Sequence, residues 1–234
     1  MPKQEPGAAK FGNFPDYYKF NPPHERMRFV RNLSKIDLQS IVQHSSIKAL
    51  DIGCNTGDLT INIWQWLSQI FAPVPVDIVG VDIDPELIKC ASNKYHEQFK
   101  QVNFQRRDVM ADSLPLVSGI ETRYSVIFCF SVTLWIHINH GDEGLKEFLT
   151  MLANSCIYLI LETQPWKCYR NAVRRAKRLH QPPFSHYDKL TNRENVTSFI
   201  DTFLVESCGM VKVRNLGCTQ WNREIILYAS TVVT

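Results

Sequence analysis

Short apolar segments alternate with helical patterns over most of the chain, and this alternation constrains the fold more than any other feature. The strand candidates are residues 47–52, 76–82, 102–106, 124–130 and 156–161. Helical patterns separate them at about 58–71, 85–99 and 142–154. A repeat of strand, helix and strand predicts a parallel sheet with crossover helices packed on its faces.

The C-terminal segment departs from this repeat. Residues 210–217, "MVKVRNLG", and residues 222–230, "NREIILYAS", both resemble strands, and only "CTQW" lies between them. Two strands joined by so short a loop pair antiparallel as a hairpin. The sequence therefore predicts an α/β, Rossmann-like fold whose mostly parallel, seven-stranded sheet ends in an antiparallel hairpin.

Capping residues indicate two helix boundaries. Asp84 and Pro85 supply an N-cap and a first helical residue for the helix over 85–99. Gly209 follows a helical pattern over 195–208 and is typical of the residue just after a helix C-terminus.

The length of 234 residues suits one α/β domain, and no repeat or linker divides the chain, so we predict a single domain over residues 1–234. Residues 1–10 are rich in Pro, Gly, Ala and Lys and are expected to be disordered. Residues 11–30 begin with closely spaced aromatic side chains and continue, after Pro22 and Pro23, into a short amphipathic helix. We expect this N-terminal arm to pack on the rest of the protein.

Composition limits the classes of protein to consider. No apolar run approaches the roughly 18 residues of a membrane span, and the N-terminus lacks the apolar region of a signal peptide. The seven cysteines are scattered singly, without a C-x-x-C pair, and no histidines cluster at metal-ligand spacing. We therefore expect a cytoplasmic monomer with reduced thiols, no bound metal and no membrane contact.

Basic residues are concentrated in one segment. The net charge of +3 does not by itself indicate a nucleic-acid partner. Residues 163–187, however, contain no Asp or Glu. The basic residues of that segment are Lys167, Arg170, Arg174, Arg175, Lys177 and Arg178.

The stretch "KALDIGCNTGDL" over residues 48–59 resembles a nucleotide-binding turn that lacks one glycine. A strand, a glycine turn and a helix N-terminus together form a nucleotide-binding corner. A dinucleotide site needs a glycine where this chain has Asn55, because the backbone there approaches a pyrophosphate. S-adenosylmethionine has no phosphate and fits such a turn, and Asn tolerates positive φ and brings an amide for the polar tail of that cofactor.

Two carboxylates follow later strands of the predicted sheet. Asp82 stands at the end of the second strand, where the ribose hydroxyls of a nucleoside cofactor would lie, and Asp108 follows the third strand, near the adenine edge. The alternative is that these aspartates cap helices and that the glycines serve only the turn. The combination favours an S-adenosylmethionine site.

Longer motifs add a family likeness. "LDIGCNTGDLT", "VDID", "FSVTLWIHINHGDEGLKEF" and "LETQPWKCYR" resemble the bicoid-interacting family of RNA methyltransferases, and the likeness runs from Phe11 nearly to the C-terminus. It implies a class I methyltransferase fold. One branch of this family caps a small nuclear RNA and has lysine where this chain has Leu134. The Q-P-W-K-C-Y-R run of this chain instead resembles the other branch, which methylates the 5′-monophosphate of small RNAs such as precursor microRNA and transfer RNA.

The resemblance implies cofactor contacts along the chain and makes the N-terminal arm a lid over the cofactor. These contacts are Tyr17, Arg26, Gly53, Cys54, Asn55, Asp82, Ile83, Asp108, Val109 and Phe130.

A terminal phosphate would need hydrogen-bond donors beside the cofactor. The candidates are His137, His140, Gln164, Lys167, Arg170 and Tyr17. Of these we expect His137, Gln164, Lys167 and Tyr17 to act at the reacting phosphate, and His140 and Arg170 to contact the RNA. A histidine in such a place is also commonly a hydrogen bonder in the core or in a loop, and that alternative stays open for both histidines.

The segment after Q-P-W has a second predicted role. Trp166 offers a face for a terminal base, whereas Trp135 is expected in the core. Helical spacing places Arg170, Arg174 and Arg178 on one stripe, away from the apolar positions. Such a stripe is commonly a solvated surface; its position beside Q-P-W and the lack of acids favour a track for the RNA backbone.

The leading hypothesis is a methyltransferase acting on the 5′-monophosphate of a small, structured RNA. Two others stay open at this stage: a methyltransferase for a small-molecule or protein acid, and a non-catalytic RNA-binding scaffold that keeps the fold.

Overall fold

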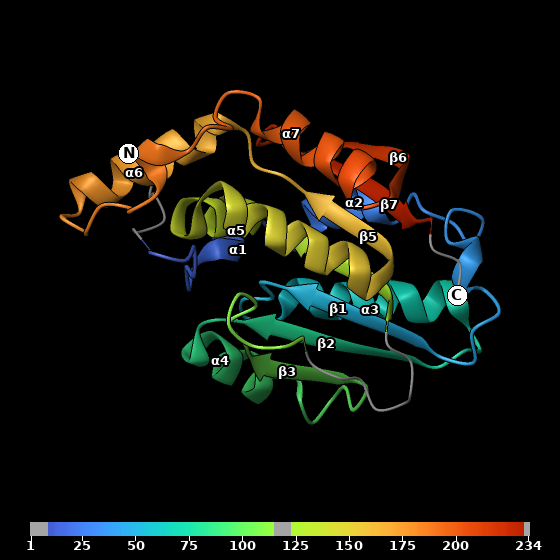
Figure 1. Ribbon diagram of the computed structural model, residues 1–234. Coiled ribbons are helices and arrows are strands. Elements are labelled where there is room, and N and C mark those ends of the chain that lie inside the picture. Colours follow the sequence, from blue (N-terminus) through green and yellow to red (C-terminus); the bar gives the residue numbers. More distant parts are fainter. Residues whose placement is uncertain (1–8, 115–122, 232–234) are drawn as a thin grey trace.

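The computed structural model describes residues 9–114 and 123–231, and within them seven strands form one sheet (Figure 1). The strands are β1 (Ile47–Ile52), β2 (Val76–Asp82), β3 (Val102–Arg106), β4 (Tyr124–Phe130), β5 (Cys156–Glu162), β6 (Met210–Cys218) and β7 (Glu224–Ser230). Their order is β3-β2-β1-β4-β5-β7-β6. β1 to β5 run parallel, and β7 pairs antiparallel with both β5 and β6. The predicted sheet and its terminal hairpin are confirmed. The expected disorder of residues 1–10 falls mostly outside the described residues.

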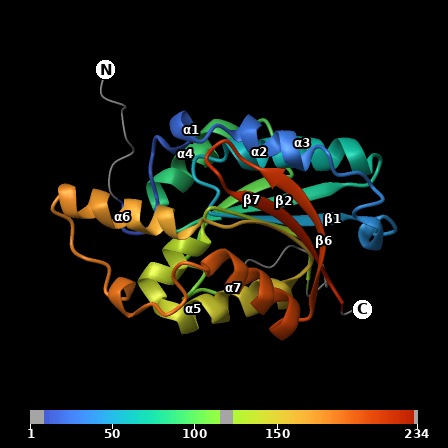
Figure 2. The same ribbon diagram turned by 90° about the horizontal axis from the view of Figure 1, so that it is seen from above.

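Helices cover both faces of the sheet (Figure 2). They are α1 (Tyr17–Phe20), α2 (Pro23–Val30), α3 (Asp58–Phe71), α4 (Pro85–Tyr95), α5 (Thr133–Ser155), α6 (Trp166–Arg178) and α7 (Val196–Thr202), with short turns at Gln39–Ile41, Tyr187–Lys189 and Phe203–Ser207. α2, α3 and α4 share one hydrophobic cluster with the sheet, and α5, α6 and α7 share the other. Alternate strand residues feed the two clusters, as Ala49 and Leu50 do in β1.

Several predicted helix boundaries are accurate. α3 spans the predicted residues, and the Asp84 side chain accepts hydrogen bonds from the backbone of Glu86 and Leu87 at the start of α4. α4 ends at Tyr95, earlier than the predicted 99. The helix expected over 195–208 is α7 followed by one π-helical turn, and it ends before Gly209, whose φ is +65°.

The start of α5 differs most from the prediction. The helix begins at Thr133 instead of 142, and Gly141, with φ 77° and ψ −173°, divides it into two parts. The first part buries Leu134, Ile136 and Ile138. Its sequence is rich in β-branched and aromatic residues, which have modest helix propensity, and burial against the sheet outweighs that propensity.

The strand order creates a crevice at one edge of the sheet. From β1 the chain proceeds through β2 to β3 on one side, and then crosses to β4 and β5 on the other. α3 follows β1 and α5 follows β4, and the two helices pack on opposite faces of the sheet. Ligands of open α/β sheets bind where neighbouring strands lead to opposite faces, so the crevice beyond β1 and β4 is the expected binding place. None of the helices described in residues 9–114 and 123–231 is long and apolar enough to cross a membrane.

Gly57 is a sensitive point of the turn that opens this crevice. Its φ is +79°, and an added Cβ would lie 2.6 Å from the ring of Phe104. We expect Gly57→Ala to destabilise the fold by more than the roughly 1–2 kcal/mol that left-handed backbone alone costs an L residue. Gly209→Ala is the matched control, because Gly209 also has positive φ but an added Cβ would meet its nearest neighbour at 3.3 Å. Denaturant unfolding measures both; equal losses would contradict the role of the Phe104 contact.

Candidate active site

The turn after β1 is fastened to β2. The backbone N–H groups of Gly53 and Cys54 both donate to the carbonyl oxygen of Val81, at 2.8 and 3.0 Å. Asn55 has φ 51°, as its predicted tolerance of positive φ requires. Its side-chain amide donates to the Phe14 carbonyl at 2.9 Å, and its side-chain oxygen accepts from the Thr56 N–H. The amide therefore holds the N-terminal arm in place, and the predicted contact of Asn55 with the cofactor's tail stays a prediction.

Asp82 stands at the end of β2 and supports the same turn. One carboxylate oxygen accepts from the Asn55 N–H and the other from the Asp84 N–H, both at 3.0 Å. The side chain is buried, and burial raises its pKa, although these two hydrogen bonds oppose the shift. Asp108, after β3, accepts from the Met110 N–H at 3.1 Å. Both carboxylates are thus fixed in direction before any ligand arrives.

These residues line one pocket, which we call the crevice pocket. The predicted cofactor residues in its lining are Tyr17, Gly53, Asn55, Asp82, Ile83, Asp108, Val109 and Phe130. His140, predicted to contact RNA, also lines this pocket. Arg26 and Cys54 do not line it, because both side chains are buried behind the surface. An added Cβ at Gly53 would come within 2.6 Å of a Val132 methyl group, so a side chain there would fill the crevice.

The N-terminal arm closes one side of this pocket. Phe11, Gly12, Asn13 and Tyr17 belong to its lining. The Asn13 amide donates to the Asp84 carboxylate at 2.6 Å, and the Tyr18 hydroxyl donates to the Cys54 carbonyl at 3.1 Å. The predicted packing of the arm on the rest of the protein is therefore observed.

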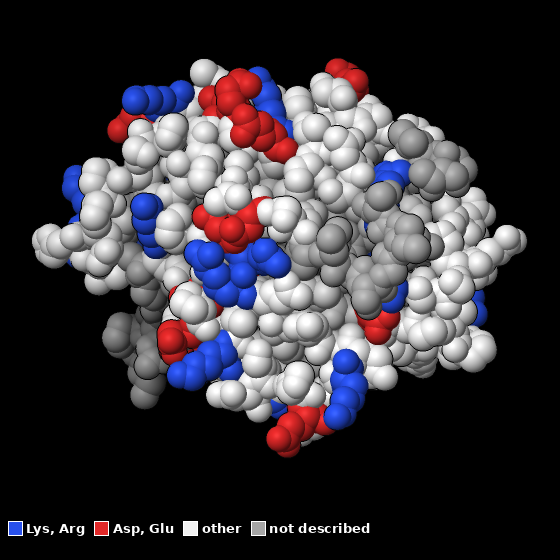
Figure 3. All heavy atoms as spheres, turned by 60° about the horizontal axis from the view of Figure 1, so that its bottom comes forward, with Lys and Arg blue, Asp and Glu red and all other residues white. Residues whose placement is uncertain are grey.

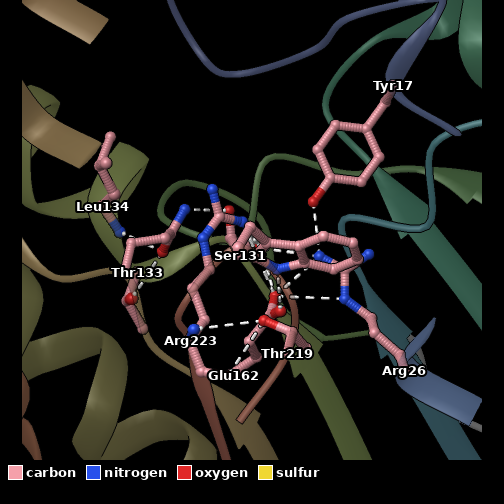
Figure 4. A network of polar contacts seen from close by, with 10 residues as sticks. Tyr17, Arg26, Ser131, Thr133, Leu134, Glu162, Thr219 and Arg223 are labelled. Carbon is pink, nitrogen blue, oxygen red and sulfur yellow. Dashed lines mark hydrogen bonds and ion pairs between the residues drawn. The ribbon is translucent and has the colours of Figure 1, made fainter. Parts of the chain in front are cut away.

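A buried cluster of charged groups lies beside the crevice pocket (Figure 4). The guanidinium of Arg26 donates to the Glu162 carboxylate at 2.7 Å, to the Tyr17 hydroxyl at 2.6 Å and to the Ser131 hydroxyl at 2.8 Å. Arg223, from the loop between β6 and β7, donates to the Ser131 hydroxyl and lies 3.9 Å from Glu162. The indole of Trp221 donates to the second Glu162 oxygen.

The cluster has two guanidinium groups and one carboxylate. Burial would lower the pKa of Arg26, but Glu162 and Tyr17 outweigh burial and raise that pKa above its usual value. Burial would likewise raise the pKa of Glu162, but Arg26 and Arg223 hold it below its usual value. All three groups are therefore charged at neutral pH, and the cluster carries one net positive charge.

A second pocket adjoins the first, and we call it the arginine pocket. Tyr17, Ser131 and Trp135 line both. The remaining lining of the arginine pocket is Phe14, Asn21, Leu134, Gln164, Cys168, Asn171, Arg175 and Arg223. Within the described part of the chain this lining contains two guanidinium groups and no carboxylate, so it suits an anion. The Gln164 side chain is held there by three hydrogen bonds: its oxygen accepts from the Thr133 hydroxyl and the Leu134 N–H, and its NH₂ group donates to the Ser131 carbonyl.

His137 does not reach either pocket, which removes it from the predicted phosphate donors. It is fully buried between α5 and α6, with Nδ1 3.1 Å from the Tyr169 hydroxyl and Nε2 3.0 Å from Asp142. Burial lowers the pKa of His137, although Asp142 opposes this. In the neutral ring, Nε2–H donates to Asp142 and Nδ1 accepts from the Tyr169 hydroxyl. The residue therefore joins the two helices, which was the alternative left open for it.

The predicted contacts at the start of α6 also lie outside the pockets. Lys167 is exposed and is not part of either lining. Trp166 stacks on Tyr187, with ring centroids 5.2 Å apart and an angle of 5°, and the guanidinium of Arg193 lies over its ring. This packing argues against Trp166 as the platform for a terminal base.

The basic stripe of α6 faces solvent. Arg170, Arg174 and Arg178 are all exposed, whereas Tyr169, Ala172 and Ala176 are buried, as the helical spacing predicts. Figure 3 shows one face of the molecule, on which acidic and basic side chains lie beside one another. The sequence of α6 differs from that mixture, because it contains basic residues and no acidic one.

Of the residues that line the arginine pocket, sequence reasoning assigned only Tyr17 and Gln164 to the site. Those that it missed include Trp135, Asn171, Arg175 and Arg223. The sequence analysis counted Arg175 among the basic residues of 163–187 but gave it no role of its own. Arg223 belongs to a loop that contains no recognisable motif. In the described ranges, 9–114 and 123–231, no group of three His, Cys, Asp or Glu side chains is placed to hold a metal ion.

Loss of the Glu162 charge is expected to destabilise the fold strongly. Glu162→Gln leaves two buried guanidinium groups without a counter-charge, and removing one partner of a buried ion pair costs about 3–5 kcal/mol. Glu143→Gln is the control, because Glu143 pairs with Lys146 at the surface at 2.7 Å, where such pairs contribute about 0–1 kcal/mol. Denaturant unfolding compares the two variants, and a Glu162→Gln loss no larger than the control's would refute the structural role of the cluster.

Comparison with known proteins identifies the family of this chain. The family model for bicoid-interacting protein 3 (Bin3) matches residues 124–230, and a methyltransferase domain model matches residues 49–155. A "Pre-miRNA 5′-monophosphate methyltransferase" of Xenopus laevis is 36% identical and aligns over 97% of this chain and 95% of its own. An "RNA 5′-monophosphate methyltransferase" of Bos taurus is also 36% identical, over 98% of this chain and 84% of its own.

A solved structure gives the same fold. The N-methyltransferase NodS of Bradyrhizobium japonicum WM9, in complex with S-adenosyl-L-homocysteine, superposes with a TM-score of 0.59 over 95% of both chains at 13% identity. The fold is thus the Rossmann-like fold of class I methyltransferases, as predicted. With relatives at 36% identity over nearly its whole length, the chain belongs to the Bin3 family of methyltransferases.

Proposed function

We propose that this protein transfers a methyl group from S-adenosylmethionine to the 5′-monophosphate of a small RNA. The observation that carries the proposal is the junction of the two pockets. The crevice pocket has acidic side chains at successive strand ends, and the arginine pocket has two guanidinium groups; Tyr17, Ser131 and Trp135 form a wall of both. The names of the Xenopus and Bos relatives support the same reaction.

The crevice pocket fits the proposed cofactor. Asp82 provides acceptors for ribose hydroxyls and Asp108 for an adenine amine. The Asn55 side chain occupies the place where a pyrophosphate would need glycine, which favours a nucleoside cofactor without phosphate. When bound, S-adenosylmethionine supplies an electrophilic methyl group attached to a positively charged sulfur.

The arginine pocket fits the proposed acceptor. A phosphate monoester has a second pKa of about 6 and is largely a dianion at neutral pH, so its oxygen needs no general base. Arg223 and Arg175 supply charge and donors. Tyr17 accepts a hydrogen bond from Arg26 and can present its own O–H bond to a ligand. These groups hold the phosphate oxygen in place, and orientation of this kind contributes most of the catalysis in a displacement reaction.

The RNA backbone is proposed to follow the exposed stripe of Arg170, Arg174 and Arg178 on α6, beside the arginine pocket. We also propose a cytoplasmic monomer. All seven cysteines are unpaired thiols, which suits a reducing compartment, and one chain supplies the walls of both pockets.

The function is tested by a methyl-transfer assay on one hairpin RNA prepared with a 5′-hydroxyl, a monophosphate or a triphosphate end. Labelled methyl groups are expected on the monophosphate RNA, and mass analysis of the terminal nucleotide should place them on the phosphate. Transfer to the hydroxyl RNA at an equal rate, or to a small acid in preference to RNA, would refute the proposal. Binding of the RNA without any transfer would favour the scaffold alternative.

Cofactor binding is expected to depend on the charge of Asp82. Asp82→Asn weakens the acceptor for the ribose, and the dissociation constant measured by calorimetry should rise at least about tenfold, since hydrogen bonds to charged groups contribute about 1.5–3 kcal/mol. RNA binding should largely survive. Burial raises the pKa of Asp82. The affinity of the unmodified protein for the cofactor should therefore be highest above that pKa, where the carboxylate is charged, and should fall as the pH drops through it and the carboxylate is protonated. An unchanged affinity in the variant would contradict the assignment.

Arg175 and Arg174 are neighbours on α6 with different expected roles. Arg175 lines the arginine pocket, so Arg175→Gln should remove most of the preference for a monophosphate end over a hydroxyl end in RNA binding. Arg174 is exposed outside the pocket. Arg174→Gln should therefore weaken the binding of the monophosphate RNA and of the hydroxyl RNA equally, and it should reduce the slope of log K against log salt concentration by about one. Titrations at several salt concentrations separate the two effects. The same behaviour in both variants would show that the pocket does not read the phosphate.

A further inference from the structure

A third pocket shares part of its lining with the arginine pocket, and we call it the aromatic pocket. It lies between the N-terminal arm, the first part of α5, the middle of α6 and the segment 181–185, and its volume is about 340 Å³, against about 130 Å³ for the arginine pocket. Phe14, Trp135 and Arg175 line both of these pockets. Figures 1 and 2 both place the arm beside the start of α5.

Aromatic rings form the walls of this pocket. The rings of Phe14 and Trp135 meet edge to face with centroids 5.8 Å apart, and Trp135 and Phe184 lie 6.4 Å apart at 53°. The guanidinium of Arg175 lies over the Phe14 ring at 5.7 Å. Pro182 and Pro183 are exposed at the rim. A lining of this kind offers flat apolar faces to a planar ligand.

The charges at this pocket indicate the kind of ligand. Lys10 and Arg175 belong to its lining, and among the described residues no carboxylate does. A volume of about 340 Å³ falls at the lower end of the roughly 300–1,000 Å³ of small-ligand sites, so a single nucleoside would suit it better than a large group. Aromatic side chains are the usual platforms for unstacked bases of RNA.

We propose that the aromatic pocket binds the base of the RNA's 5′-terminal nucleotide while the phosphate of the same nucleotide lies in the arginine pocket. This inference rests on the proposed function. Arg175 belongs to both pockets, and a 5′-phosphate and its own base are joined by a single ribose, so one nucleotide can occupy both. Trp135 lines all three pockets and so borders the cofactor, the phosphate and the base.

Stacking predicts the selectivity of this pocket. Every base has a π face, so the presence of a base at the 5′ end should matter more than its identity. The removal of one aromatic wall should raise the dissociation constant roughly 5- to 150-fold, which is the equivalent of the about 1–3 kcal/mol that one stacked base contributes.

The direct test uses a short 5′-monophosphorylated RNA with 2-aminopurine as its terminal base, whose fluorescence falls when the base stacks. Binding to the unmodified protein is expected to quench the fluorescence. Phe184 lines the aromatic pocket and neither of the other two, so Phe184→Ala should lose most of the quenching. Phe199→Ala is the matched control, because Phe199 packs on Phe203, 5.9 Å away. It should quench like the unmodified protein. Full quenching with Phe184→Ala, or none with the unmodified protein, would overturn the inference.

Methyl transfer separates this inference from the proposed function. Phe184→Ala should lower kcat/KM about tenfold for ordinary monophosphate RNA, equivalent to about 1.4 kcal/mol. The same substitution should change kcat/KM little for an RNA whose terminal nucleotide lacks its base. Equal losses on both RNAs would refute the aromatic pocket and leave the function intact. Quenching in the unmodified protein without transfer to any monophosphate RNA would refute the function and still support the pocket.

Discussion

Two arginines share one buried carboxylate where the crevice pocket meets the arginine pocket. Arg26 comes from α2, Glu162 from the end of β5 and Arg223 from the loop between β6 and β7, so the cluster joins three segments that are distant in sequence. Burying charges is unfavourable unless they are paired and hydrogen-bonded. The hydroxyls of Tyr17 and Ser131 and the indole of Trp221 supply further bonds, so in this arrangement the buried charges are both paired and hydrogen-bonded.

The consequences of this arrangement extend to both pockets. Arg26 fixes the Tyr17 hydroxyl, and with it the part of the arm that borders the crevice. Ser131, with φ 62°, is held by both arginines and lines both pockets. The excess of one positive charge remains beside the place proposed for the phosphate. A structural cluster thus also provides part of the field that would attract the acceptor.

The sequence predicts well those features that depend on local pattern. Buried parallel strands are continuous apolar runs between polar ends, which explains the accurate limits of β1 and β2. Asp82 and Asp108 reach one crevice because parallel strands end at the same edge of a sheet. The likeness to the family pointed to Tyr17 and Gln164, and both line the arginine pocket.

Features that depend on packing between distant segments escape sequence reasoning. His137 was a candidate donor because its partners, Asp142 and Tyr169, are apparent only once α5 and α6 lie together. Arg174 and Arg175 are adjacent in sequence, yet they point about 100° apart on a helix, and only the packing of α6 decides which of them faces a pocket. Arg223 lies in a hairpin loop with no motif of its own, so its place beside Glu162 follows from the fold alone.

The most direct measurement is a crystal structure with S-adenosylhomocysteine and a short 5′-monophosphorylated RNA bound together. The account predicts adenosine at Asp82 and Asp108, and phosphate between Arg175 and Arg223, with one phosphate oxygen about 3–3.5 Å from where the methyl carbon would lie. An adenosine outside the crevice, or a phosphate bound away from the arginine pocket, would contradict it.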